Sequence, residues 1–177
     1  MIEIKFIGRG GQGAVLASQM LAKVYFLMGL YPQCYSLFGG ERRGAPVSGF
    51  LRVDQKKILL KCEIKRPDRM IYLAADLIDP QEIQSHLKPD GLILINSPSI
   101  EPFPGLQSFR CLQIDARAIA EAVGLGATIN TTVLGAYCRA EGSIPFEYLE
   151  RAIKETVPAK IEANLRAAGT AYEMVKA

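Results

Sequence analysis

Residues 4–21 read IKFIGRGGQGAVLASQML, an apolar run that passes through closely spaced glycines into a second apolar segment. The run Ile2–Ile7 has the length and residue types of a β-strand. A helix is predicted after the glycines, from about residue 13 to 28, because Leu16 and Met20 recur at helical spacing. A strand, a glycine turn and a helix in this order are typical of the start of an α/β fold.

The glycines follow the spacing G-x-G-x-x-G at Gly8, Gly10 and Gly13. The first permits a tight turn, the second lets backbone N–H groups approach a ligand, and the third lets helix and strand pack closely. The N-terminus of the following helix favours phosphate or another anion. The candidate binding residues are therefore Gly8, Gly10, Gly11 and Gly13, although glycines that serve only close packing would give the same pattern.

A dinucleotide site also needs an acidic residue at the end of the second strand, where it holds the ribose hydroxyls. Residues 35–40 read YSLFGG and offer none, and Glu41 follows inside a loop. Arg42 and Arg43 could instead bind a 2′-phosphate, so NADP remains an alternative ligand. The sole histidine, His86, is expected at the surface, and no acid–base constellation is evident, so no catalytic residue is predicted.

The rest of the chain alternates extended and helical patterns. Further strands are predicted near Cys34 and at Val47–Val53, Met70–Ala74, Leu92–Asn96 and Cys111–Ile114. Further helices are predicted at Pro80–Leu87, after Asp115, and at Asn130–Ala140, Phe146–Glu155 and Lys160–Val175, the last with an apolar stripe of Ile161, Leu165, Ala168, Tyr172 and Val175. The run Lys57–Cys62 is expected to form a hairpin with Val47–Val53. The pattern predicts an α/β fold, a three-layer Rossmann-like domain over residues 1–177 with a mostly parallel sheet and an inserted β-hairpin.

The composition excludes several classes of protein. A net charge of +3, from 21 Lys and Arg against 18 Asp and Glu, is too small for a nucleic-acid binder. The four cysteines lie too far apart in the sequence for a metal or iron–sulfur site, and buried reduced thiols are expected. Neither a signal sequence nor a membrane span is evident, so a cytoplasmic location is predicted.

Two further segments carry candidate binding residues. Residues 38–49, FGGERRGAPVSG, place Arg42 and Arg43 between glycines, where one arginine can meet an anion and the other Glu41 or a partner. A solvated charged loop is the alternative. Asn130 and Thr131 form a second candidate contact, although a helix cap explains them equally well.

The combination of GRGGQGAV at residues 8–15 with FGGERRGAPV at residues 38–47 resembles the gamma subunit of pyruvate or 2-ketoisovalerate ferredoxin oxidoreductases. NTTVLGA at residues 130–136 and KIEANLRAAGTAYE at residues 160–173 extend the resemblance along nearly the whole chain. ERRGAP at residues 41–46 is more similar to the pyruvate branch than to the 2-oxoglutarate branch, and Gly40 departs from the bulkier residue common in the family.

The resemblance implies a non-catalytic subunit of a hetero-oligomeric oxidoreductase that converts a 2-oxoacid to an acyl-CoA and reduces ferredoxin. Thiamine diphosphate, Mg²⁺ and [4Fe–4S] clusters would lie in other chains. The implied partners are alpha and beta subunits, with a delta subunit as a further candidate, and ferredoxin through the complex. The implied role is to close the active site and to contact coenzyme A. An NADP-binding reductase and a nucleotide-binding regulatory module remain alternatives.

Overall fold

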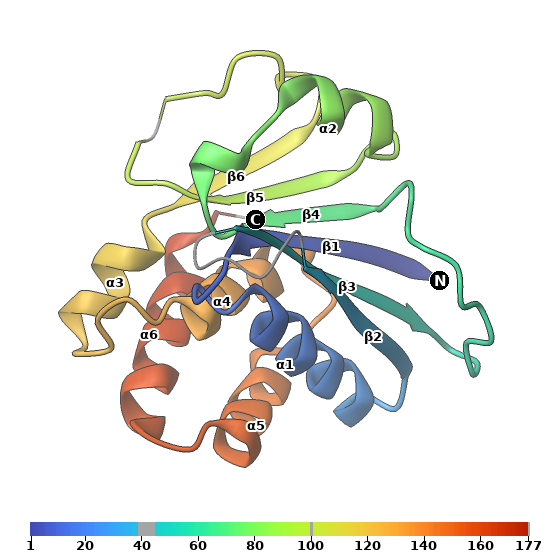
Figure 1. Ribbon diagram of the computed structural model, residues 1–177. Coiled ribbons are helices and arrows are strands. Elements are labelled where there is room, and N and C mark those ends of the chain that lie inside the picture. Colours follow the sequence, from blue (N-terminus) through green and yellow to red (C-terminus); the bar gives the residue numbers. More distant parts are fainter. Residues whose placement is uncertain (39–44, 100, 177) are drawn as a thin grey trace.

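The computed structural model describes residues 1–38, 45–99 and 101–176, and Figure 1 shows a sheet with helices on both faces. The strands are β1 (Ile2–Arg9), β2 (Tyr31–Phe38), β3 (Pro46–Asp54), β4 (Arg69–Tyr72), β5 (Leu92–Asn96) and β6 (Arg110–Ile114). The helices are α1 (Ala14–Leu27), α2 (Pro80–His86), α3 (Ala116–Ala122), α4 (Asn130–Glu141), α5 (Phe146–Thr156) and α6 (Ile161–Met174), with a 3₁₀ turn at Ala75–Leu77. These elements lie close to their predicted positions.

The six strands form one sheet in the order β2-β3-β1-β4-β5-β6. β1, β4, β5 and β6 are parallel, whereas β3 is antiparallel to both β1 and β2. β2 therefore runs in the same direction as β1, and only β3 is reversed. The expectation of a mostly parallel sheet is confirmed. The half beyond β1 differs from a doubly wound sheet, because β3 occupies the place where a parallel strand would pair with β1.

The predicted hairpin between Val47–Val53 and Lys57–Cys62 is wrong. Val47–Val53 belongs to β3, which pairs along its whole length with β2 on one side and β1 on the other. Because both edges of β3 are occupied, no edge is left to pair with residues 57–62, which form no strand. The hairpin of the fold is β2–β3, and its second strand is inserted between β1 and β2.

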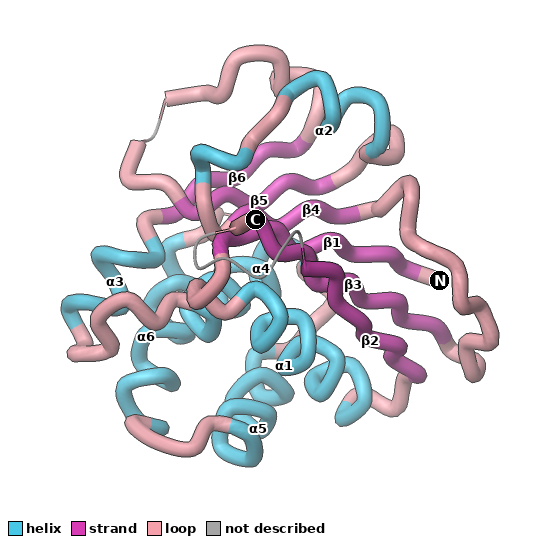
Figure 2. Tube along the Cα trace, in the orientation of Figure 1, coloured by secondary structure: helices cyan, strands magenta, loops and turns pink. Residues whose placement is uncertain are grey.

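The sheet separates two apolar clusters. α1 and α3–α6 form one layer against the sheet (Figures 1 and 2). Ile4 and Phe6 of β1 are fully buried in the larger cluster, which contains residues of these helices. Ile7 of β1 points to the opposite face, where it joins a smaller cluster with Met70 of β4 and Ile83 of α2. This alternation follows from the two-residue period of a strand. The result is a helix–sheet–helix arrangement with unequal outer layers.

α4 is the central helix of the large layer, and Gly135 lets α6 approach it closely. A Cβ atom at Gly135 would lie 2.0 Å from the carbonyl oxygen of Ala168. The face of α6 that is buried consists of small residues, namely Ala163, Asn164, Ala167, Ala168 and Ala171. The predicted stripe packs on the core: Ala168 and Val175 are buried, and Ile161, Leu165 and Tyr172 lie half-buried beside them.

Candidate functional site

The glycine loop follows β1 and closes on itself. The N–H of Gln12 donates to the carbonyl of Arg9 at 3.0 Å, and the Gln12 side-chain oxygen accepts from the Arg9 N–H at 2.7 Å. Gly11 and Gly13 have φ values of +94° and +85°, which strongly favour glycine. Within the described part of the chain, the N–H groups of Gly11 and Gly13 find no acceptor, so both are available to a ligand.

The other two glycines of the motif have structural contacts. A Cβ atom at Gly8 would lie 3.2 Å from the Cβ of Ala14 and 3.4 Å from that of Leu73, so Gly8 permits the close packing of β1, α1 and β4. The N–H of Gly10 donates to the carbonyl of Ala45 at 3.0 Å. This bond leaves the Gly10 N–H engaged, and it joins the glycine loop to the residue that follows the arginine loop.

The N-termini of α1 and α4 converge beside this loop. Gly13 is the N-cap of α1 and Ile129 is the N-cap of α4, and neither helix has a side-chain cap. A Cβ atom at Gly13 would lie 3.4 Å from the Cβ of Asn130, the first residue of α4. The partial positive charges of both helices are therefore directed to one place, where they favour an anion.

Asn130 and Thr131 differ in their surroundings. Asn130 is not the N-cap, but its side-chain oxygen accepts from the N–H of Thr131 at 3.0 Å, so it satisfies one amide of the first turn. Thr131 is fully buried, and its hydroxyl donates to the side-chain oxygen of Asn164 at 2.8 Å. Thr131 thus links α4 to α6, while Asn130 lies nearer the glycine loop.

Arg9 and Asp76 form an ion pair at the same edge of the sheet, which the sequence did not single out. The Arg9 Nε lies 3.1 Å from Asp76 Oδ2, and the hydrogen bond from Arg9 lowers the pKa of this carboxyl group. Asp76 follows β4 as the glycine loop follows β1. The carboxyl ends of adjacent parallel strands lie at one edge, and this would have been the signal.

A cavity of about 520 Å³ adjoins the two helix N-termini. Its lining is mainly apolar, and it includes Leu16, Met20, Leu125, Asn130, Val157 and Lys160. Leu16, one of the two apolar residues that recur at helical spacing in α1, is 59% exposed, whereas Met20 is buried. Asn130 belongs both to the cavity and to the glycine-loop site.

The predicted Arg42, Arg43 and Glu41 lie outside the described residues. Their sequence neighbour Ala45 is bonded to Gly10, and Pro46 pairs with Arg9 in the sheet. The first described residues after the arginine loop therefore lie beside the glycine loop.

The cysteines and the histidine offer no further site. Cys138 is buried, Cys34 and Cys111 are half-buried, and burial raises the pKa of all three thiols. Cys62 is exposed, so the expectation of four buried thiols is wrong for this residue. His86 is exposed at the end of α2, as expected. Over the described ranges no group of three His, Cys, Asp or Glu gathers as metal ligands. None of the described helices combines the length and the apolar character that a membrane span requires.

Residues 3–174 match the family model of pyruvate ferredoxin/flavodoxin oxidoreductase. The chain belongs to this family. It is 42% identical to the pyruvate/ketoisovalerate oxidoreductases common subunit gamma of Pyrococcus furiosus, over 98% of this chain and 96% of that protein. It is 43% identical to the pyruvate synthase subunit PorC of Methanocaldococcus jannaschii, over 99% and 98% respectively. The structure of pyruvate oxidoreductase subunit PORC from Thermotoga maritima matches with a TM-score of 0.83 and 32% identity, over 99% of this chain and 97% of that one.

These matches confirm the resemblance found in the sequence. The oxidoreductase subunit belongs to the gamma type and to a multi-subunit complex that acts on 2-oxoacids with ferredoxin. The similarity to gamma subunits extends over nearly all of this chain and nearly all of each relative.

Proposed function

We propose that this gamma subunit serves a pyruvate-type complex, closes its active site and contacts coenzyme A through the glycine loop. The observation that carries this proposal is the convergence of two helix N-termini, neither with a side-chain cap, at Gly13 and Asn130. Coenzyme A carries a diphosphate and a 3′-phosphate, and backbone N–H groups at helix N-termini bind such groups. Arg42 or Arg43 would supply charge-assisted hydrogen bonds to phosphate or to a partner.

The observed contacts divide the candidate residues into those proposed to touch the ligand and those proposed to support the site. Gly11, Gly13 and Asn130 are the proposed ligand contacts. The N–H groups of Gly11 and Gly13 have no acceptor in the described chain, and Asn130 Nδ2 lies 3.6 Å from the Cβ position of Gly13. Gly8 and Thr131 are proposed to support the site through packing and through the bond to Asn164. The apolar cavity beside Asn130 suits the uncharged pantetheine arm of the same ligand.

The redox chemistry is proposed to reside in companion chains. Alpha and beta subunits, with delta as a further candidate, would hold thiamine diphosphate, Mg²⁺ and [4Fe–4S] clusters and would pass electrons to ferredoxin. The protein would act in the cytoplasm as one gamma-type domain over residues 1–177. Membership of the family favours this role over an NADP-dependent reductase or a regulatory nucleotide-binding module.

Replacing Arg42 and Arg43 together by alanine is expected to raise the KM for coenzyme A about tenfold or more in the reconstituted complex, since a hydrogen bond to a charged group is worth about 1.5–3 kcal/mol. Steady-state kinetics with varied coenzyme A measures this. Arg117→Ala is the control, because Arg117 lies exposed on α3 and pairs with Glu121. An unchanged KM together with intact assembly of the double variant would show that the arginine assignment is wrong.

Gly13→Ala is expected to raise the same KM, because a methyl group at a φ of +85° would stand at the proposed anion site beside Asn130. Gly124→Ala is a matched control, since its φ of +80° carries a similar backbone cost and no atom lies within 4 Å of its Cβ position. Both variants should lose about 1 kcal/mol of stability. If both affect the KM for coenzyme A equally, the glycine loop has no specific role in binding it.

A further inference from the structure

Residues 55–66, QKKILLKCEIKR, connect β3 to β4 and form a surface that we call the basic strap. It carries five cationic side chains and one acidic side chain, all exposed: Lys56, Lys57, Lys61, Lys65, Arg66 and Glu63. None of the five cations takes part in an ion pair with another described residue. Elsewhere many basic side chains have a carboxylate partner, such as Lys23 with Glu155. The strap is therefore a local excess of positive charge.

The strap also exposes large apolar side chains. Leu59 is 78% exposed and Leu60 is 46% exposed. On the strand beside them, Tyr31 and Leu37 of β2 are about half exposed. These are four of the eight large hydrophobic side chains that the described surface exposes. Apolar side chains gathered within a charged rim are typical of an interaction surface.

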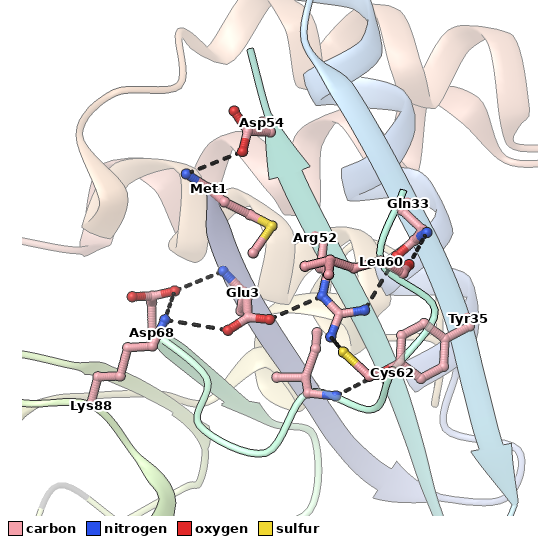
Figure 3. A network of polar contacts seen from close by, with 11 residues as sticks. Met1, Glu3, Gln33, Tyr35, Arg52, Asp54, Leu60, Cys62, Asp68 and Lys88 are labelled. Carbon is pink, nitrogen blue, oxygen red and sulfur yellow. Dashed lines mark hydrogen bonds and ion pairs between the residues drawn. The ribbon is translucent and has the colours of Figure 1, made fainter. Parts of the chain in front are cut away.

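Hydrogen bonds from the sheet hold the inner side of the strap in place (Figure 3). The Gln33 side chain donates to the carbonyl of Leu60 at 2.8 Å, and the Ile64 N–H donates to the Tyr35 hydroxyl at 2.8 Å. Arg52 donates to the Cys62 sulfur at 3.8 Å. Although it has no regular secondary structure, the strap is fixed at three positions and so is preorganised for binding.

The charges beneath the strap compensate one another. Arg52 is 1% exposed, and its Nε lies 3.0 Å from Glu3, which also pairs with Lys88 at 3.3 Å. Lys88 in turn lies 3.0 Å from Asp68 (Figure 3). The two cations and two anions of this network, of which only Arg52 is fully buried, leave no surplus charge. The uncompensated charge belongs to the outward side chains of the strap, where a partner can reach it.

β2 extends this surface to an open edge of the sheet. It is the outermost strand, and no other strand within the described ranges pairs with its outer side. A cavity of about 480 Å³ lies between β2 and the strap, lined by Gln33, Tyr35, Leu37, Leu60 and Cys62 among others. Natural proteins usually protect or cover an exposed edge strand.

We propose that the basic strap and the adjoining face of β2 form the docking surface for an acidic surface on a companion subunit of the complex. The positive charge of the strap favours an acidic partner over a second copy of this chain. A second copy of this chain, docked through the same patch by two-fold symmetry, would bring five cations against five. The inference rests on the proposed function only in requiring companion subunits.

The test is to co-express the complete complex with Lys56→Glu, Lys57→Glu and Lys61→Glu combined in the gamma chain. The dissociation constant of this subunit is expected to rise at least about tenfold, because like charges across an interface are strongly unfavourable. Added salt should weaken the wild-type complex and have less effect on the variant, or strengthen it. Lys154→Glu, Arg166→Glu and Lys176→Glu together give a control with the same charge change on exposed residues elsewhere, and assembly should be unchanged.

A substitution of an exposed apolar residue, with a matched control, tests the same surface without changing its charge. Leu59→Ser should weaken assembly about tenfold, since a leucine side chain that is buried at an interface loses its apolar contacts when it is replaced by serine. Met174→Ser, also at an exposed residue, should leave assembly unchanged. Thermal unfolding of the isolated chains should match the wild type, which shows that the fold is intact.

The alternative outcomes are distinct. If the wild type assembles and the strap variants assemble equally well, the docking inference is overturned and the proposed function stands. If the isolated wild type is a dimer and the isolated strap variants are monomers, the strap binds a second copy of the chain, and the inference is also overturned. If the wild type does not join companion subunits at all, both proposals fail.

Discussion

Gly135→Ala is expected to lower the free energy of unfolding by about 3 kcal/mol, and Gly135→Val to prevent folding. A Cβ atom at this position would lie 2.0 Å from the carbonyl oxygen and 2.8 Å from the Cα of Ala168. These are backbone atoms of α6, so no side chain can rotate away, and the two helices would have to separate. Urea unfolding followed by circular dichroism measures the loss.

Gly169→Ala on α6 is the matched control. Only a ring atom of Phe146, at 3.8 Å, lies within 4 Å of the Cβ position at Gly169. Alanine in the interior of a helix is favoured over glycine by about 0.5–1 kcal/mol, so this variant should be slightly more stable than the wild type. Equal effects of the two substitutions would contradict the close approach at Gly135, because helix propensity alone would then explain both.

Gly135 also shows where sequence reasoning reaches its limit. The segment NTTVLGA correctly predicts a helix, but the reason for its glycine is a backbone contact with residue 168, far along the chain. The same limit explains the wrong hairpin. The local pattern predicts the extended run at Val47–Val53, whereas the strands that pair with it are decided only in the folded sheet.

The candidate site likewise has one part that the sequence predicts and another that only the folded structure shows. The glycine spacing is local, so the loop and the start of α1 could be predicted from residues 8–13. The position of Asn130 beside Gly13 could not, because tertiary packing brings the two segments together. The surplus charge of the strap was likewise hidden in a net charge of +3, since only the structure shows which charges have partners.

The second large effect is expected at Arg69, where replacement by methionine should lower the free energy of unfolding by about 3 kcal/mol. Arg69 binds Glu141 through Nε at 2.7 Å and Nη2 at 3.2 Å, which joins β4 to the end of α4. The hydrogen bond with Glu141 raises the pKa of Arg69, so this side chain stays charged. The Glu141 side chain is only 7% exposed, and without Arg69 its charge would remain buried with a single hydrogen bond from Tyr137.

Two further variants separate this cause from a general loss of packing. Arg69→Met combined with Glu141→Leu should regain most of the lost stability, because paired apolar residues replace a buried ion pair with little cost. Arg117→Ala removes a comparable contact on the surface, where Arg117 and Glu121 are both more than half exposed, and should change stability by less than about 0.5 kcal/mol.

The comparison of Arg69→Met with the double variant provides the sharpest test. The single variant should be the less stable of the two, because it alone leaves the Glu141 carboxylate buried without a cationic partner. Chemical unfolding of both variants measures the difference. A double variant no more stable than Arg69→Met would mean that Arg69 acts through the packing of its hydrocarbon stem and that the ion pair contributes little.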